Sequence, residues 1–160
     1  MNMIFVKGCG FLSNKNKIFR LSEMAHKIGM STRTLIRWDE QGLFVPFVSP
    51  AGQKYYTYFM YLNYLAISNI PFDQIKSMDH EITDEDMEYI RHKRHLSELA
   101  ASGKTDEEIK QSDASLDDLD MGFIETERKR LRFIESQHAV HKLASTKKNK
   151  VRGNVDDTKI

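Results

Sequence analysis

The sequence predicts a mainly α protein: a winged helix-turn-helix head followed by a helical C-terminal region with one long helix. The head is predicted by two short amphipathic segments around a glycine turn and by two β-prone segments around a Pro/Gly turn. The C-terminal region is predicted by apolar residues at helical spacing over residues 116–144. We divide the chain into an arm (1–20), the head (21–80), a helical interaction region (81–145) and a basic, disordered tail (146–160).

Two short helices are expected between residues 21 and 42. Ser22 is the expected N-cap of the first helix, because its hydroxyl can accept a hydrogen bond from a free N–H of the first turn. Gly29 ends this helix, since glycine adopts the left-handed conformation of a C-terminal cap at little cost. Ser31 caps the second helix and Gly42 ends it. Such a pair presents the N-terminal side chains of its second helix to the major groove of DNA.

The wing is expected directly after the second helix. Residues 44–48 and 53–56 are rich in β-branched and aromatic side chains, which is typical of strands. Between them Pro50 presets the backbone dihedral of the second turn position, and Gly52 suits the fourth. Pro46 restricts its strand to the edge of a sheet. A helix pair followed by such a hairpin is a winged helix-turn-helix.

Several short motifs between residues 29 and 78 match a known pattern in both order and spacing. They are Gly29-Met30-Ser31, Arg33-Thr34-Leu35, Asp39, Gly42-Leu43, Gly52-Gln53-Lys54-Tyr55-Tyr56 and the run 70–78. On these motifs, residues 21–78 resemble the DNA-binding half of the MerR-type transcriptional regulators. In two departures, Ile36 replaces a usual arginine and Arg37-Trp38 replaces a pair of tyrosines. The Arg-Trp version is closer to the winged headpieces of some transposon serine recombinases.

The resemblance implies a sequence-specific DNA-binding regulator of transcription, with the second helix in the major groove and the wing on the phosphate backbone. Regulators of this family are usually dimers on a pseudo-palindromic site. We therefore expect double-stranded DNA as a partner, and a homodimer joined through the long C-terminal helix. The Arg-Trp variant keeps an alternative open: an architectural or accessory protein for recombination, segregation or replication of a mobile element. A third alternative is an adaptor whose acidic middle binds a basic protein.

Five side chains are candidates for DNA contact. Arg33 and Arg37 lie one turn apart on one helix face, and the guanidinium fork matches O6 and N7 of guanine. Thr32 can reach a base or a phosphate. Lys54 stands where the resembled family has a wing arginine, and it would neutralise a phosphate. Tyr56 either hydrogen-bonds to the DNA backbone or braces the wing.

Charge is unevenly distributed along the chain, although the net charge of its 160 residues is only +1. Residues 1–60 carry 8 Lys/Arg against 3 Asp/Glu, residues 61–127 carry 6 against 17, and residues 128–160 carry 10 against 3. Phosphate contacts dominate the non-specific affinity of proteins for DNA, so the two basic ends are expected to face DNA. The acidic middle is interpreted as a solvated face.

A third helix is expected after the wing, with Thr57 as its cap. Tyr58, Tyr61 and Tyr64 recur in it at a spacing of three, which favours packing in a core or interface over stacking on bases. Before the head, the β-prone run 3–6 is expected to form either an extra strand or a loosely held arm.

Two capping boxes and a heptad pattern organise the rest of the chain. The boxes, each opening a helix, are Thr83 with Asp86 and Thr105 with Glu108. In the long helix, Ile124, Leu131 and His138 repeat every seven residues. This is a poor coiled-coil seam, because Glu127 and two histidines occupy it. Dimerisation and packing of this helix on its own domain are equally consistent with the pattern.

Other classes of protein are not indicated. The single cysteine, Cys9, excludes a disulfide framework within one chain and suits a reducing compartment. No run approaches the roughly 20 apolar residues of a membrane span. The pairs His92/His95 and His138/His141 lack a convincing third ligand, so neither a metal nor a cofactor is expected. Without a catalytic constellation, the expectation is a cytoplasmic, nucleoid-associated protein that is not an enzyme.

Overall fold

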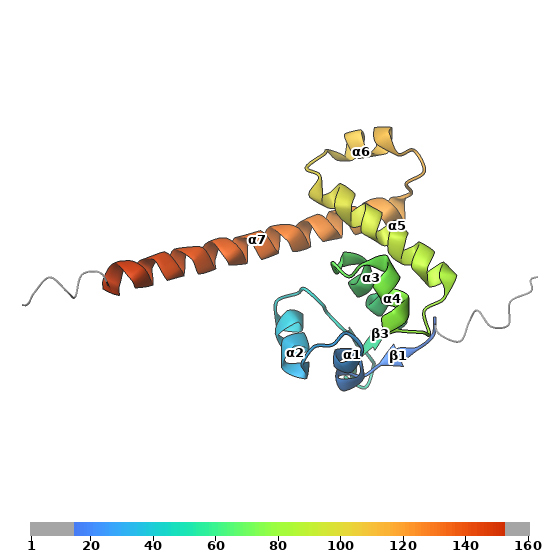
Figure 1. The fold of residues 1–160 in the computed structure, drawn as a ribbon, viewed down its shortest axis with the longest axis horizontal. Coiled ribbons are helices and arrows are strands. Elements are labelled where there is room, and N and C mark those ends of the chain that lie inside the picture. Colours follow the sequence, from blue (N-terminus) through green and yellow to red (C-terminus); the bar gives the residue numbers. More distant parts are fainter. Residues whose placement is uncertain (1–14, 153–160) are drawn as a thin grey trace, which may run out of the picture. The chain divides into compact units, whose positions relative to one another are not determined.

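The structure, a computed structural model, describes residues 15–152 (Figure 1). It is mainly helical with a small antiparallel sheet, which confirms the predicted fold class. Residues 1–14 lie outside the described part, and with them Cys9 and the β-prone run 3–6. Within the described part, none of the helices combines the length and the apolar composition that crossing a membrane requires.

The chain divides into two compact units, Met1–His95 and Leu96–Ile160. The first holds the elements β1 (Ile18–Phe19), α1 (Leu21–Lys27), α2 (Thr32–Glu40), β2 (Phe47–Val48), β3 (Lys54–Thr57), α3 (Tyr58–Ile67), α4 (Phe72–Met78) and most of α5 (Asp84–Ala101). The second holds the end of α5, α6 (Asp106–Ser112) and α7 (Asp118–Arg152). The predicted boundary after residue 80 precedes α5, whereas the first unit continues into this helix.

The helix pair α1 and α2 forms where it was predicted, with one different cap. The N-cap of α1 is Arg20 rather than Ser22, and the Arg20 N–H donates to Glu23 Oε2 at 2.7 Å. Ser31 caps α2 as predicted, since its Oγ accepts from the Thr34 N–H at 3.1 Å. Gly29 follows α1 with a φ of +68°. This left-handed conformation, which favours glycine, turns the chain from one helix into the next.

A three-stranded antiparallel sheet with the order β1-β3-β2 carries the wing. Strands β2 and β3 pair with Phe47 opposite Tyr55, and β2 lies at an edge as Pro46 predicts. In the turn between them, the Gly52 N–H donates to the Ser49 carbonyl at 2.8 Å, and Gly52 has a φ of +79°. The third strand, β1, was not predicted, because two residues are too few to give a periodic signal.

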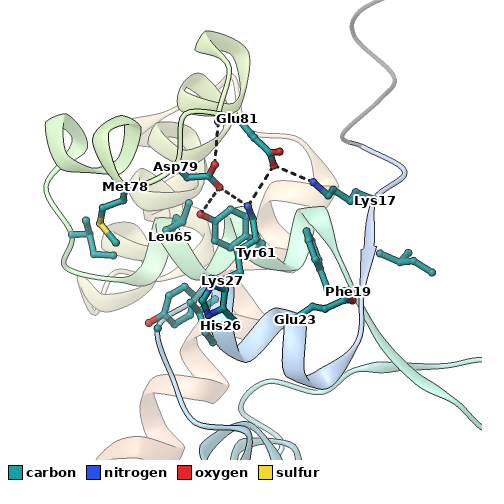
Figure 2. A pocket seen from close by; sticks show the side chains of 15 residues that line it. Lys17, Phe19, Glu23, His26, Lys27, Tyr61, Leu65, Met78, Asp79 and Glu81 are labelled. Carbon is teal, nitrogen blue, oxygen red and sulfur yellow. Dashed lines mark hydrogen bonds and ion pairs between the residues drawn. The ribbon is translucent and has the colours of Figure 1, made fainter.

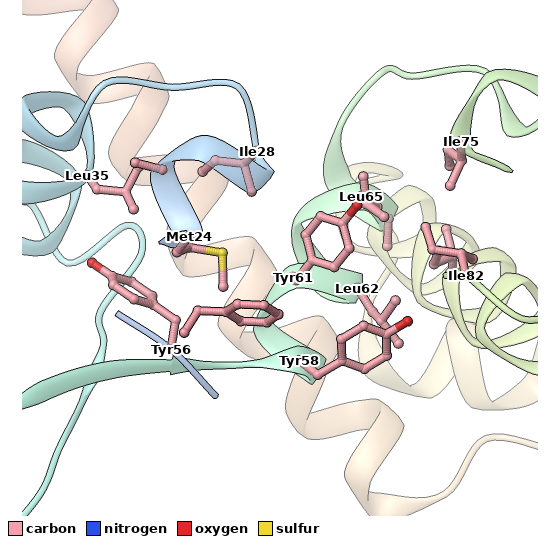
Figure 3. Close-up of a cluster of buried hydrophobic side chains, with 14 of the residues drawn as sticks. Met24, Ile28, Leu35, Tyr56, Tyr58, Tyr61, Leu62, Leu65, Ile75 and Ile82 are labelled. Carbon is pink, nitrogen blue, oxygen red and sulfur yellow. The ribbon is translucent and has the colours of Figure 1, made fainter. Parts of the chain in front are cut away.

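The core of the first unit is centred on α3, whose buried side chains form one cluster with those of α1, α2 and β3 (Figure 3). Met24, Leu35 and Leu62 are fully buried in it. Tyr58 and Tyr61 are also buried, which confirms that these rings pack in the core. Their hydroxyls donate to Asp86 Oδ2 and Asp79 Oδ2, each at 2.9 Å. Burial, reinforced by these carboxylates, raises the pKa of both tyrosines above the ordinary value.

Helix α5 is tied to the first unit by its capping box and by one arginine. The Thr83 N–H donates to Asp86 Oδ2 at 3.0 Å, and the Asp86 N–H donates to Thr83 Oγ1 at 3.2 Å. The Arg94 guanidinium donates to four carbonyl oxygens, those of Leu65, Ala66, Ser68 and Ile70. These carbonyls belong to the last turn of α3 and the loop after it. Arg94 therefore satisfies acceptors that the helix end leaves open.

The second unit has its own smaller core, formed by Leu96, Ala100, Ile109 and Ile124. Glu127 is also buried, and it accepts hydrogen bonds from Ser97 Oγ at 2.9 Å and from the Arg130 guanidinium. A buried carboxylate needs such partners to remain charged. Ile124, the first position of the predicted seam, is thus buried in the core of its own unit.

Helix α7 is longer than predicted. It continues to Arg152 rather than ending at about Ala144, so it includes residues 146–152, which the sequence analysis assigns to the tail. That prediction rested on low hydrophobicity, which argues against burial but not against helix formation. Residues 142–152 contain neither glycine nor proline and include good helix formers, and Gly153 is the first strong breaker.

Candidate DNA interface

The outward face of α2 is a stripe of polar and charged side chains with one apolar member. Leu35 is fully buried and Trp38 is half-buried, so these residues fix the inward face. On the opposite side, each exposed position has neighbours three and four residues away, which places the set on one helix face: Arg33, Ile36, Arg37 and Glu40. With Ser31 and Thr34 they line a surface hollow of about 350 Å³.

The two arginines of this face are exposed and available. Among the described residues, neither Arg33 nor Arg37 has an ion-pair partner. Each guanidinium therefore offers all its N–H donors to a ligand. The structure brings these two candidates together at one hollow, whereas Thr32 is exposed at the first residue of the same helix and does not line the hollow.

Lys54 extends from the wing to the same helix. It lies in β3, and its Nζ forms an ion pair with Asp39 Oδ2 near the C-terminal end of α2. The Lys54 side chain remains 59% exposed, whereas that of Asp39 is 18% exposed. An ammonium has three donors, so this ion pair fixes Lys54 beside α2 without exhausting its capacity to bind an anion.

Tyr56 does not lie on this surface. It is 1% exposed, and its ring stacks on Phe44 with centroids 5.3 Å apart. Burial, followed in size by the charge of Asp39, raises the pKa of the Tyr56 hydroxyl. A DNA contact from Tyr56 does not agree with this position, which instead fits the alternative that it braces the wing. Tyr55 is the outer residue of the pair and stacks on Phe47.

On another side of the first unit, two lysines are held by carboxylates, next to a cavity of about 690 Å³ (Figure 2). Lys27 Nζ lies 2.7 Å from Asp79 Oδ2, and Lys17 Nζ lies 3.0 Å from Glu81 Oε2. Lys27 Nζ also lies 4.8 Å from the centroid of the Tyr61 ring. The hydrogen bond and charge of Lys17, followed by the charge of Lys27, hold the pKa of Glu81 below its ordinary value. These lysines are therefore already neutralised.

The histidine pairs do not form a metal site in the part of the chain that is described. No three or more His, Cys, Asp or Glu side chains among residues 15–152 are grouped so that they could hold a metal ion.

Comparison with known proteins gives one match. Residues 19–58 match the family model described as MerR HTH family regulatory protein. No curated protein matches the chain. No solved structure matches it. The matched segment begins in β1 and ends at the first residue of α3, so it contains α2, the wing and all five predicted contact residues. Residues 19–58 therefore form a MerR-type helix-turn-helix DNA-binding region, of the kind that regulators of transcription carry.

Proposed function

We propose that the chain is a sequence-specific, DNA-binding regulator of transcription that inserts α2 into the major groove and rests its β2–β3 wing on the phosphate backbone. The observation that carries the proposal is the pair of exposed arginines without ion-pair partners on the outward face of α2, within the matched segment. Guanidinium groups are the donors best suited to guanine edges and phosphates.

The spacing of the arginines suits the geometry of duplex DNA. Residues 33 and 37 are one helical turn apart, about 6 Å along the helix axis. This is close to two steps of one DNA strand, which rises about 3.4 Å per nucleotide. Arg33 and Arg37 can therefore contact neighbouring positions along one groove, while Thr32 reaches the adjacent backbone or base.

The wing supplies a second anchor at a fixed distance from α2. Lys54 is attached to α2 through Asp39, and the buried Tyr56 holds β3 against Phe44. These contacts limit the movement of the hairpin relative to the helix. We therefore assign Lys54 to a phosphate and leave Tyr56 out of the DNA contacts.

A second copy of the chain completes the proposed regulator. One recognition helix reads only a few base pairs, and dimers of such heads read two half-sites about one DNA turn apart. Because Ile124 is used within its own unit, we assign the contact between copies to the part of α7 after Leu131. Val140 is 63% exposed in that part. We place the protein in the cytoplasm, on the nucleoid.

The experiment is a selection of bound duplexes from a random library with the purified full chain. A short enriched motif, repeated with dyad symmetry, is expected. The variant carrying Arg33→Ala and Arg37→Ala should enrich no motif. The matched control, Lys76→Ala with Arg91→Ala, removes two cations from other helices of the first unit and should return the parental motif. Equal motifs from both variants would contradict the proposal.

The accessory role is separated from regulation by where the chain binds in cells. Sites between promoter elements are expected for a regulator. Sites confined to recombination, partition or replication regions would favour the accessory protein instead. Mapping with the full chain and with the double-arginine variant identifies the sites that depend on α2.

A further inference from the structure

We infer that Ile36 is a specificity-determining residue that contacts the 5-methyl group of a thymine in the major groove. The inference rests on the proposed function, since it requires that α2 enters the groove. It adds a base preference that neither arginine supplies.

Ile36 is the apolar member of an otherwise polar stripe. Its side chain is 46% exposed and lines the hollow that Arg33 and Arg37 also line. The inward face of α2 is already filled by Leu35 and Trp38, so packing of this unit does not require an isoleucine at position 36. A β-branched residue is also a slightly poor choice for an exposed helix position.

The position of Ile36 is between the arginines and the wing. Asp39 follows it by three residues, so the two side chains share one side of α2. Asp39 is the residue that Lys54 of the wing binds. When the arginines face base edges and Lys54 faces a phosphate, Ile36 faces base edges next to them.

An isoleucine in that position favours one base pair on chemical grounds. It offers no hydrogen bond, so it leaves the N4 amino group of cytosine or the acceptors of guanine without a partner when it covers them. Thymine alone among the unmodified bases presents a methyl group in the major groove, and the contact removes apolar surface of both partners from water. Burying one methyl group corresponds to about a fourfold gain in affinity.

The probe is thymine replaced by deoxyuridine, which deletes the 5-methyl group and leaves the hydrogen-bonding groups unchanged. The selected duplex is remade with one replacement at a time, and the dissociation constant of the full chain is measured for each. We expect one thymine per half-site at which the replacement weakens binding about fourfold. A cytosine at that position should bind more weakly than thymine, and 5-methylcytosine should recover part of the loss.

The Ile36→Ala variant tests whether this side chain is responsible. It should bind the thymine and deoxyuridine duplexes equally, while its dependence on salt stays parental because no charge has changed. Ile18→Ala is the matched control, since Ile18 is an exposed isoleucine of the same unit in β1, and it should keep the parental ratio.

Three results would overturn the inference and leave the proposed function intact: a selected motif without thymine, no loss at any deoxyuridine, or the same ratio in Ile36→Ala as in the parent. A chain that selects no motif at all would remove the proposed function together with this inference.

Discussion

Two sides of the first unit each carry a pair of cations, and the pairs are in different states. Arg33 and Arg37 on α2 are exposed, without ion-pair partners among the described residues. Lys17 and Lys27, beside the cavity of Figure 2, bind carboxylates at 3.0 and 2.7 Å. The comparison teaches that a local excess of Lys and Arg does not by itself locate a DNA-facing surface. It singles out the two arginines as cations without an ion pair, while Lys54 of the wing is paired with Asp39 but stays 59% exposed.

The neutralising carboxylates come from a different part of the sequence. Asp79 and Glu81 belong to the acidic middle, residues 61–127, whereas the lysines belong to the basic residues 1–60. The acidic stretch is thus more than a solvated face, because part of it fixes the loop before α5 to Lys27 of α1 and to Lys17, which precedes β1. The charge count of the head alone overstates the positive surface that DNA would meet.

The largest effect is expected from Lys27→Met, which keeps the apolar stem and removes the charge. Asp79 is left with a carboxylate that is only 12% exposed and has lost its cation. The free energy of unfolding should fall by about 3 kcal/mol, at the low end for breaking a buried pair. Urea unfolding measures it. DNA affinity at a temperature where the variant is folded should stay parental, and a large loss of affinity would show that Lys27 contacts DNA.

The same ion pair predicts a dependence on pH. Burial alone would raise the pKa of Asp79, but hydrogen bonds from Lys27, the Glu81 N–H and Tyr61 outweigh it and lower the pKa below 3.8. The stability from this group is therefore present above the ordinary pKa and is lost as pH falls below it. Urea unfolding from about pH 6 to pH 2 should show a smaller acid loss in Asp79→Asn than in the parent. Parallel curves would contradict this role.

A smaller effect is expected from breaking the ion pair between Lys54 of the wing and Asp39 of α2. Asp39→Asn releases Lys54 from its ion pair and removes a negative charge from α2. DNA affinity should rise about fivefold, and the free energy of unfolding should change by less than about 1 kcal/mol, because the pair is partly exposed. A binding titration at fixed salt measures the first quantity. Lys54→Ala should lower the affinity, and if it has no effect the wing lysine is not a phosphate contact.

The smallest effect is expected from Tyr56→Phe. This change removes only the hydroxyl of a buried ring, so DNA affinity should remain within about twofold of the parent, as for a residue that meets no phosphate. A loss of DNA affinity as large as that from Lys54→Ala would show that the Tyr56 hydroxyl contacts DNA.

Local signals predicted the helix pair and the turn of the wing. Ser31 caps α2 through an N–H three residues away, and Gly52 closes a turn of four residues, so both depend on neighbours in sequence. Arg20 replaced Ser22 as the cap of α1 because β1 ends directly before it, and a strand of two residues gives no pattern. For the helix pair α1 and α2, the buried and exposed faces were thus predictable, but the first residue of α1 was not.

Other features of the site depend on contacts between residues far apart in the sequence, and local sequence patterns did not predict them. Whether Tyr55 or Tyr56 faces inward depends on the pairing of β3 with both neighbours. The Lys54–Asp39 and Lys27–Asp79 ion pairs join residues far apart in the chain. The two arginines needed less information, because an exposed face of an amphipathic helix follows from periodicity alone.

The most direct test of the account compares the salt dependence of DNA binding for two double variants. Arg33→Ala with Arg37→Ala should reduce the slope of log K against log salt by up to about 1.8, the value that two lost phosphate contacts would give. Lys17→Met with Lys27→Met removes the same charge from the neutralised side and should leave the slope unchanged, on protein shown to be folded by circular dichroism. An unchanged slope for the arginine variant, or an equal fall for both, would contradict the claim that α2 carries the DNA-binding surface.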